Sequence, residues 1–167
     1  MRRIVIAAAA AFVMVLFAGC GSHENIKAGS INFTFDCKAD VTSPQGNMSY
    51  LLDRDGAAET SLQVLSGLSK GLCWYWDGDG FSATYKGLAV KSGECVLPDD
   101  SPANIMVRVL SAAEKDGALT ASGNGEFAGS TDDGTDFTLT ADSETCNINT
   151  VSVPDYGIKV KFYDYKQ

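Results

Sequence analysis

The chain has 167 residues and a formal net charge of −8, from 13 Lys and Arg against 21 Asp and Glu. Binding to nucleic acid or to an anionic membrane surface depends on clustered Lys and Arg, so this acidic composition argues against both kinds of contact. A chain of this length builds one hydrophobic core and is too short for two ordinary domains.

The first nineteen residues have the pattern of a secretion signal. Arg2 and Arg3 precede fifteen uncharged, mostly aliphatic residues at 4–18. A helix of that length measures about 22 Å, which is short of the ~30 Å hydrocarbon core of a bilayer. We therefore expect residues 1–19 to be a cleaved signal peptide, and an uncleaved membrane anchor is the alternative.

A cysteine follows directly after this signal. The segment 16–20 (LFAGC) resembles the lipobox of bacterial lipoproteins, with Phe17 where leucine is most common. The resemblance implies that Cys20 receives diacylglycerol and becomes the new N-terminus. Two acyl chains suffice for stable anchoring. We expect an extracytoplasmic protein that is lipid-anchored to the bacterial cell membrane, with residues 20–30 as a flexible tether.

Cysteine usage fits an oxidising compartment. The chain has five cysteines, and lipidation of Cys20 leaves an even number for pairing. We expect two disulfides, against the alternative of unpaired buried thiols, and the sequence does not choose among the three pairings. The candidates are Cys37, Cys73, Cys95 and Cys146.

Alternation of apolar and polar residues begins at position 31 and predicts a single domain of mainly β structure over 31–167. The segment 61–68 fits helix or strand by periodicity, and Gly67 favours a strand. Turns are expected at 53–56 and at 77–80 (DGDG), where two aromatic runs form the clearest hairpin. The expected strands are 31–41, 48–52, 61–68, 72–76, 81–85, 119–127, 135–141, 146–153 and 158–165.

One helix is expected, beginning at Ser101 as N-cap with Pro102 in the first turn and ending before Gly117. Its apolar stripe consists of Ile105, Met106, Val109, Leu110 and Ala113. The predicted fold class is α+β, mainly β. We expect a single curved antiparallel sheet, or unclosed barrel, of about nine strands, with the amphipathic helix covering its concave face.

These features together resemble the LolA/LppX-type lipoprotein-carrier fold of bacterial envelope lipoproteins. The resemblance covers nearly all of 31–167 and is carried by the segments 31–41, 70–88, 97–98 and 158–165. In that family an unclosed antiparallel barrel wraps helices and encloses an apolar cavity that carries acyl chains or other lipids. This chain is shorter and has one clear helix.

Candidates for catalysis or metal binding are few. Asp53-x-Asp55-Gly56 and the DGDG turn match the start of a calcium loop, but the twelfth positions hold Val64 and Leu88 instead of an acidic residue. His23, the single histidine, lies in the expected tether, where a general base would not be held in place. We expect no metal, no cofactor and no enzymatic activity.

Aromatic residues on the strands and apolar residues on the helix are the candidates for lining a site for a lipid or other hydrophobic ligand. They are Phe33, Phe35, Trp74, Trp76, Phe81, Tyr85, Ile105, Met106, Val109, Leu110, Phe137 and Phe162. The predicted function is binding or carrying such a ligand at the membrane. The alternative is a non-catalytic structural or protein-interaction lipoprotein with a filled core and an envelope protein as partner.

Overall fold

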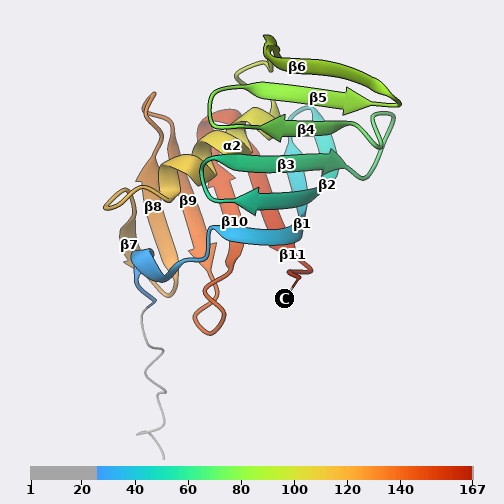
Figure 1. The fold of residues 1–167 in the computed structure, drawn as a ribbon. Helices are drawn as coiled ribbons and strands as arrows, with labels where there is room; N and C mark the ends of the chain where they lie inside the picture. The colour runs from blue at the N-terminus through green and yellow to red at the C-terminus, as the bar shows by residue number, and fades with distance from the viewer. Residues whose placement is uncertain (1–25, 167) are drawn as a thin grey trace, which may run out of the picture.

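The computed structural model describes residues 26–166, which form one antiparallel sheet and one α-helix, α2 (Figure 1). Eleven strands follow one another in the sheet in the order β6-β5-β4-β3-β2-β1-β11-β10-β9-β8-β7, which leaves β6 and β7 as its two edges. The strands are β1 (Thr34–Ser43), β2 (Gly46–Asp55), β3 (Glu59–Val64), β4 (Cys73–Trp76), β5 (Phe81–Tyr85), β6 (Leu88–Cys95), β7 (Thr120–Gly123), β8 (Glu126–Ser130), β9 (Asp136–Ala141), β10 (Ile148–Val153) and β11 (Ile158–Tyr163).

The expected mainly β fold with one helix and an unclosed sheet is confirmed, with eleven strands instead of nine. One additional strand is β6, whose sequence lacks regular alternation. The other arises because 119–127 forms two strands, β7 and β8. Asn124 and Gly125 between them both have positive φ, the backbone geometry of a tight two-residue turn.

The expected turn at 53–56 begins later than predicted. Asp53, Arg54 and Asp55 continue β2, and the chain turns only after them, at Gly56, which has a φ of 61°. Position 54 therefore lies in a central strand and shares its face with Tyr50 and Leu52, which are both buried.

Side chains on the concave face form rows that run across the strands. The pairing registers place one row at Cys37, Leu52, Leu62, Trp74, Ala83 and Val90, from β1 to β6. A second row across the other half joins Val41, Val160, Val151, Leu139, Phe127 and Ala121. Because facing residues of antiparallel strands share one side of a sheet, these rows make the inner surface apolar.

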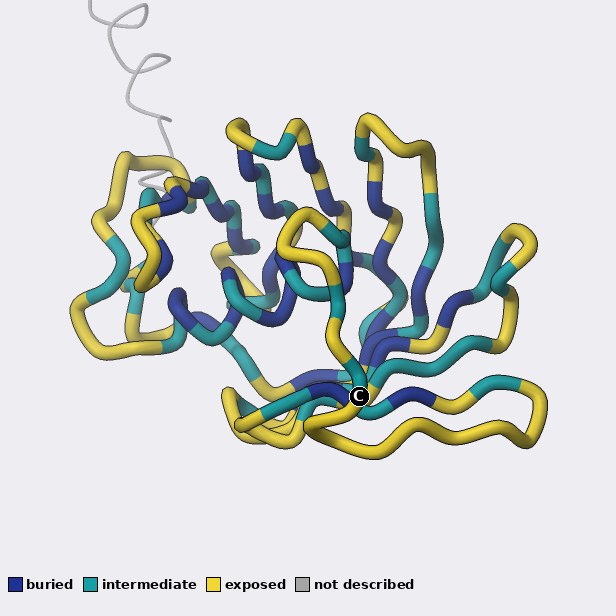
Figure 2. Tube along the Cα trace, turned by 90° about the horizontal axis from the view of Figure 1, so that it is seen from above, coloured by how far each residue is buried: buried dark blue, intermediate teal, exposed yellow. Residues whose placement is uncertain are grey.

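Helix α2 (Pro102–Ala113) lies inside the curve of the sheet and nearest to β8 (Figures 1 and 2). The Ser101 side chain accepts a hydrogen bond from the Asn104 backbone N–H, as expected of an N-cap. The buried residues of α2 are Ala103, Ile105, Met106, Val107, Val109, Leu110, Ala112 and Ala113. Within residues 26–166, no helix is both long enough and apolar enough to cross a bilayer.

Residues 26–30, which the sequence places in the tether, contact the domain. Ala28–Ser30 forms the 3-10 helix η2, and the side chains of Ile26 and Ala28 pack against the core. The predicted signal peptide, Cys20 and His23 lie outside the described residues.

Candidate functional site

Eleven of the twelve predicted lining residues belong to the core or pack against it, and Tyr85, at the end of β5, lies outside this cluster. Phe35, Phe81, Phe137 and Phe162 are buried, as are the four helix residues Ile105, Met106, Val109 and Leu110. The other four, Phe33, Trp74, Trp76 and Tyr85, are half-buried. The sheet residues among them come from both halves of the sheet, so the fold brings all of these positions except Tyr85 together in one core with α2.

This apolar interior is filled by side chains. Buried residues of the sheet and of α2 form one continuous cluster. The small void beside Ile105, Val109 and Tyr156 has no room for a water molecule. Three larger hollows among the described residues are open grooves at the surface, and none of these three is an enclosed cavity for an acyl chain.

The apolar face continues past the helix toward the β6 edge. Leu88 and Val90 lie on its concave side, where they pair with Tyr85 and Ala83, and are 74% and 43% exposed. Trp74 on β4 is half-buried next to Ala83. We call these five residues, Trp74, Ala83, Tyr85, Leu88 and Val90, the open strip. Leu88 and Val90 are the exposed residues of this strip, Trp74 and Tyr85 are half-buried, and Ala83 between them is buried.

Two polar residues interrupt the apolar rows of the concave face. Arg54 and Thr60 face each other on β2 and β3, and each is only 1% exposed. Arg54 donates hydrogen bonds to the Phe33 carbonyl at 2.6 Å and to the Glu114 carboxylate at 2.9 Å. Burial lowers the pKa of Arg54, while the contact with Glu114 raises it. These contacts tie the C-terminal end of α2 to the sheet.

Arg54 was not identified from the sequence because the Asp-Arg-Asp-Gly motif predicts a turn, and Thr60 lies just before the predicted strand 61–68. The signal in the sequence is the two-residue spacing of Tyr50, Leu52 and Arg54, which places all three side chains on the same face of a strand. Among residues 26–166, the Arg54 Nε and Thr60 hydroxyl atoms have no hydrogen-bond partner. A buried polar atom without a partner carries a desolvation penalty of about 1–3 kcal/mol.

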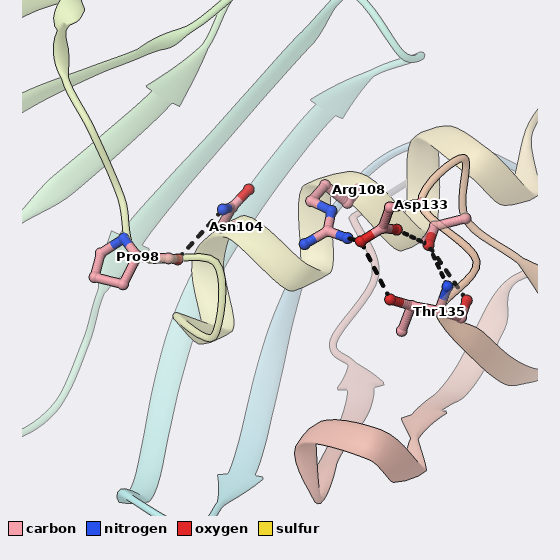
Figure 3. Close-up of polar contacts among 6 residues, drawn as sticks. Pro98, Asn104, Arg108, Asp133 and Thr135 are labelled. Carbon is pink, nitrogen blue, oxygen red and sulfur yellow. Dashed lines mark hydrogen bonds and ion pairs between the residues drawn. The ribbon is translucent and has the colours of Figure 1, made fainter.

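A groove of about 590 Å³ follows the side of α2 between Trp76 and Tyr156. Figure 3 shows the polar contacts that hold its wall together. Arg108 on α2 forms an ion pair with Asp133 in the β8–β9 connection, and Asn104 donates a hydrogen bond to the Pro98 carbonyl at 3.3 Å. Its ion-paired cations and mixed lining make this groove unsuited to an apolar ligand.

The β8–β9 connection is itself ordered by hydrogen bonds. The Thr131 hydroxyl donates to Asp133, and the Thr135 backbone N–H donates to the Thr131 hydroxyl at 3.1 Å. The Thr131 hydrogen bond and the Arg108 guanidinium lower the pKa of Asp133 to about 2. Asp133 is therefore a structural carboxylate that fixes this loop against α2.

The two expected disulfides are not formed. All four candidate cysteines are free thiols, because their strands and loops do not place any two of them at bonding distance. Cys37 is buried on the concave face of β1, whereas Cys73 on β4 contacts the Ser61 hydroxyl on the other face. Burial, followed by the charge of Asp36, raises the pKa of Cys37 to about 12, which keeps this thiol protonated.

The DGDG motif serves as a backbone turn, whereas Asp53 and Asp55 of the other acidic motif lie in β2. The Asp77 carboxylate accepts hydrogen bonds from the backbone N–H groups of Asp79 and Gly80, an arrangement that closes the β4–β5 hairpin. Within the described part of the chain, no three His, Cys, Asp or Glu residues are arranged to hold a metal ion.

Comparison with known proteins gives structural likeness only. No family model matches the sequence, and no curated protein matches it. Among solved structures, the chain is similar to a LolA superfamily protein from Nitrosomonas europaea, with a TM-score of 0.42 and 8% sequence identity. The alignment covers 80% of this chain and 85% of that chain. At this identity the likeness concerns the fold alone.

Proposed function

We propose that this protein is an extracytoplasmic lipoprotein, anchored to the bacterial cell membrane by diacylglycerol on Cys20. The support is the charged start, the apolar stretch and the lipobox-like segment 16–20. Ile26, the first described residue, follows Cys20 by six positions, a stretch that spans at most roughly 20 Å. The domain would therefore stay close to the membrane that holds it.

We further propose that the domain binds a hydrophobic ligand, such as a fatty acid or a lipid acyl chain, and is not an enzyme. The observation that carries this proposal is the open strip. Its half-exposed Trp74 and exposed Leu88 continue the apolar concave face beyond α2. Apolar concave surfaces with few polar groups are typical of sites for hydrophobic molecules. The ligand would lie along the strip, since the interior is filled.

A fluorescent fatty acid tests this proposal. cis-Parinaric acid is titrated, without detergent, into protein that begins at Gly21, and its emission is recorded. Binding should be saturable in the wild type. Leu88→Asp and Val90→Asp place a charge on the strip at exposed positions and should each lower the affinity by roughly tenfold or more, because a charge excludes an acyl chain.

The matched control is Thr84→Asp, which adds the same charge at an exposed position on the convex face of β5. It should bind the fatty acid as the wild type does. No saturable binding to the wild type, or equal binding by Val90→Asp, would show that the open strip is not the site.

The second candidate function is a structural or protein-interaction lipoprotein. The specific observation in its favour is the close-packed interior, in which sheet and helix side chains form one cluster around α2. An envelope protein would then contact the exposed surface. Failure of fatty-acid binding, together with capture of a defined envelope protein by the immobilised domain, would favour this candidate.

A further inference from the structure

Strand β6 is the longer of the two edges of the sheet, and seven of its eight residues are exposed. The opposite edge, β7, has four residues and ends at Gly123, which has a positive φ. An edge strand carries unpaired backbone N–H and C=O groups along its outer side. β6 is therefore the edge that can accept another extended chain.

The hairpin register identifies which backbone groups of β6 point outward. Tyr85 and Leu88 flank a two-residue turn, Lys86-Gly87, in which both φ angles are positive. The residues that flank such a turn exchange both of their backbone hydrogen bonds, and the pattern repeats every second residue. Leu88 and Val90 therefore bond to β5, and the backbone groups of Ala89 and Lys91 point away from the sheet.

Only a polypeptide can pair with such groups. An extended peptide offers a donor and an acceptor at strand spacing, whereas an acyl chain offers neither. Its side chains on the concave side would cover Leu88 and Val90, which are exposed now, and would extend the row of Trp74 and Ala83. The concave side of the added strand should therefore be apolar.

Three lysines lie on or near β6. Lys91 is on the strand, which also carries Glu94, and Lys86 is in the β5–β6 turn, with its Nζ 4.8 Å from the centre of the Tyr85 ring. The β3–β4 connection, which contains Lys70, is close to this turn, because the Tyr85 hydroxyl donates to the Leu68 carbonyl at 3.3 Å. None of these three lysines forms an ion pair with another residue of 26–166. Of the three, Lys91 lies on the convex side of β6, so the convex-side residue of an added strand that faces it should be acidic.

We propose that the β6 edge binds an extended polypeptide segment in which apolar and acidic residues alternate. The apolar residues face Leu88 and Val90, and the acidic residues face Ala89 and Lys91. The regular edge is short, since Gly93 has a φ of 82° and the β5–β6 register shifts between Val90 and Cys95. Affinity then depends on two outward-facing residues and on the flanking charges.

Fluorescence anisotropy with the labelled peptide Glu-Val-Glu-Val-Glu-Val-Glu tests this proposal on the full-length protein in lipid nanodiscs. The peptide should bind, more weakly at high salt, and the charge-reversed peptide with Lys in place of Glu should not. Ala89→Pro removes an outward N–H group without affecting bonds to β5, and Lys91→Glu reverses the charge. Each should lower the affinity by roughly tenfold. Lys161→Glu on central strand β11 is the control and should bind normally.

The proposal is overturned if the wild type does not bind the acidic peptide, or if Ala89→Pro and Lys91→Glu bind it equally well while their circular dichroism is unchanged. Native mass spectrometry that shows a wild-type dimer lost in Ala89→Pro would also overturn it, because the edge would then pair with a second copy. Fatty-acid binding does not involve Lys91. Failure of the peptide proposal is therefore distinguishable from failure of the lipid proposal.

Discussion

At the level of single residues, Arg54 and Glu114 form the pair that joins the sheet to the end of α2. Their burial is unequal, because the Arg54 side chain is fully buried and that of Glu114 is 31% exposed. A buried charge that loses its partner is strongly destabilising, whereas replacing the buried charge itself by an apolar side chain of similar length is often tolerated. The two halves of the pair should therefore respond differently to substitution.

We expect Glu114→Ala to reduce the free energy of unfolding by about 2–4 kcal/mol, since it leaves Arg54 buried without its carboxylate. Arg54→Met removes the buried charge and leaves Glu114 with access to water, so it should reduce the free energy of unfolding by less than about 2 kcal/mol. Urea unfolding at pH 7 measures both values. A larger loss in Arg54→Met than in Glu114→Ala would contradict this account of the pair.

Asp133 gives a prediction for pH dependence. Its pKa is lowered from 3.8 to about 2, first by the Thr131 hydroxyl and then by Arg108. A carboxylate with a lowered pKa in the folded state stabilises the protein above its unfolded pKa, and this contribution is lost as the pH falls toward its folded pKa. The amount by which the free energy of unfolding of the wild type exceeds that of Asp133→Asn should therefore shrink as the pH falls from about 4 to about 2.

Thr131→Val checks the cause of that shift, because it removes the hydroxyl that donates to Asp133. The pKa of Asp133, followed by the NMR shift of its side-chain carboxyl carbon, should rise toward its ordinary value. A pKa unchanged in Thr131→Val would assign the shift to Arg108 alone.

At the level of elements, the β7–β8 hairpin depends on one glycine. Gly125 has a φ of 73°, and a Cβ added there would lie 2.6 Å from the Ala141 carbonyl oxygen. Gly134, in the β8–β9 connection, has a similar φ of 83°, with no atom within 4 Å of an added Cβ. The two positions therefore share a backbone requirement and differ in the space around them.

Gly134→Ala should lower the free energy of unfolding by about 1–2 kcal/mol, which is the strain of a left-handed conformation in an L-residue. Gly125→Ala adds a steric clash with the Ala141 backbone, so it should lower the free energy of unfolding by clearly more than Gly134→Ala does. Chemical denaturation of both variants provides the comparison. Equal losses would mean that the close approach to Ala141 has no energetic consequence.

Elements with strong local signals could be predicted from the sequence. The DGDG turn and its aromatic flanks indicate β4 and β5, and Ser101-Pro102 marks the start of α2. Strand β6 could not be predicted, because Lys91, Ser92 and Gly93 break the alternation and its residues are held by pairing to β5 alone. Tertiary pairing therefore overrides a weak local pattern at this edge.

For the whole molecule, alternation and the helical stripe predict which residues face inward, and the single core around α2 agrees with them. The same patterns do not determine how closely α2 approaches the sheet. This distance is set by interlocking side chains from distant segments, and it decides whether the concave face holds a cavity or a filled core. Most of the predicted lining residues therefore lie in a filled core, and the accessible apolar part of the concave face is at the open strip.

The proposed lipid anchor concerns the whole molecule, because it would hold the domain at the membrane. Cys20→Ala should abolish attachment of diacylglycerol, and mass spectrometry of the purified protein should show the loss of the lipid mass. Because the acyl chains provide the membrane affinity in this proposal, signal cleavage at another site would release the domain from the membrane fraction. Wild-type protein that carries no lipid on Cys20 would contradict the anchor.

The chain has two tryptophans, Trp74 and Trp76, and both lie on β4, the strand that begins the open strip. A brominated fatty acid that binds the strip should therefore quench tryptophan fluorescence in a saturable way, and this measurement tests the central proposal most directly. We expect saturable quenching in the wild type and its loss in Val90→Asp. Absence of saturable quenching in the wild type, or equal quenching in Val90→Asp, would contradict hydrophobic-ligand binding at this site.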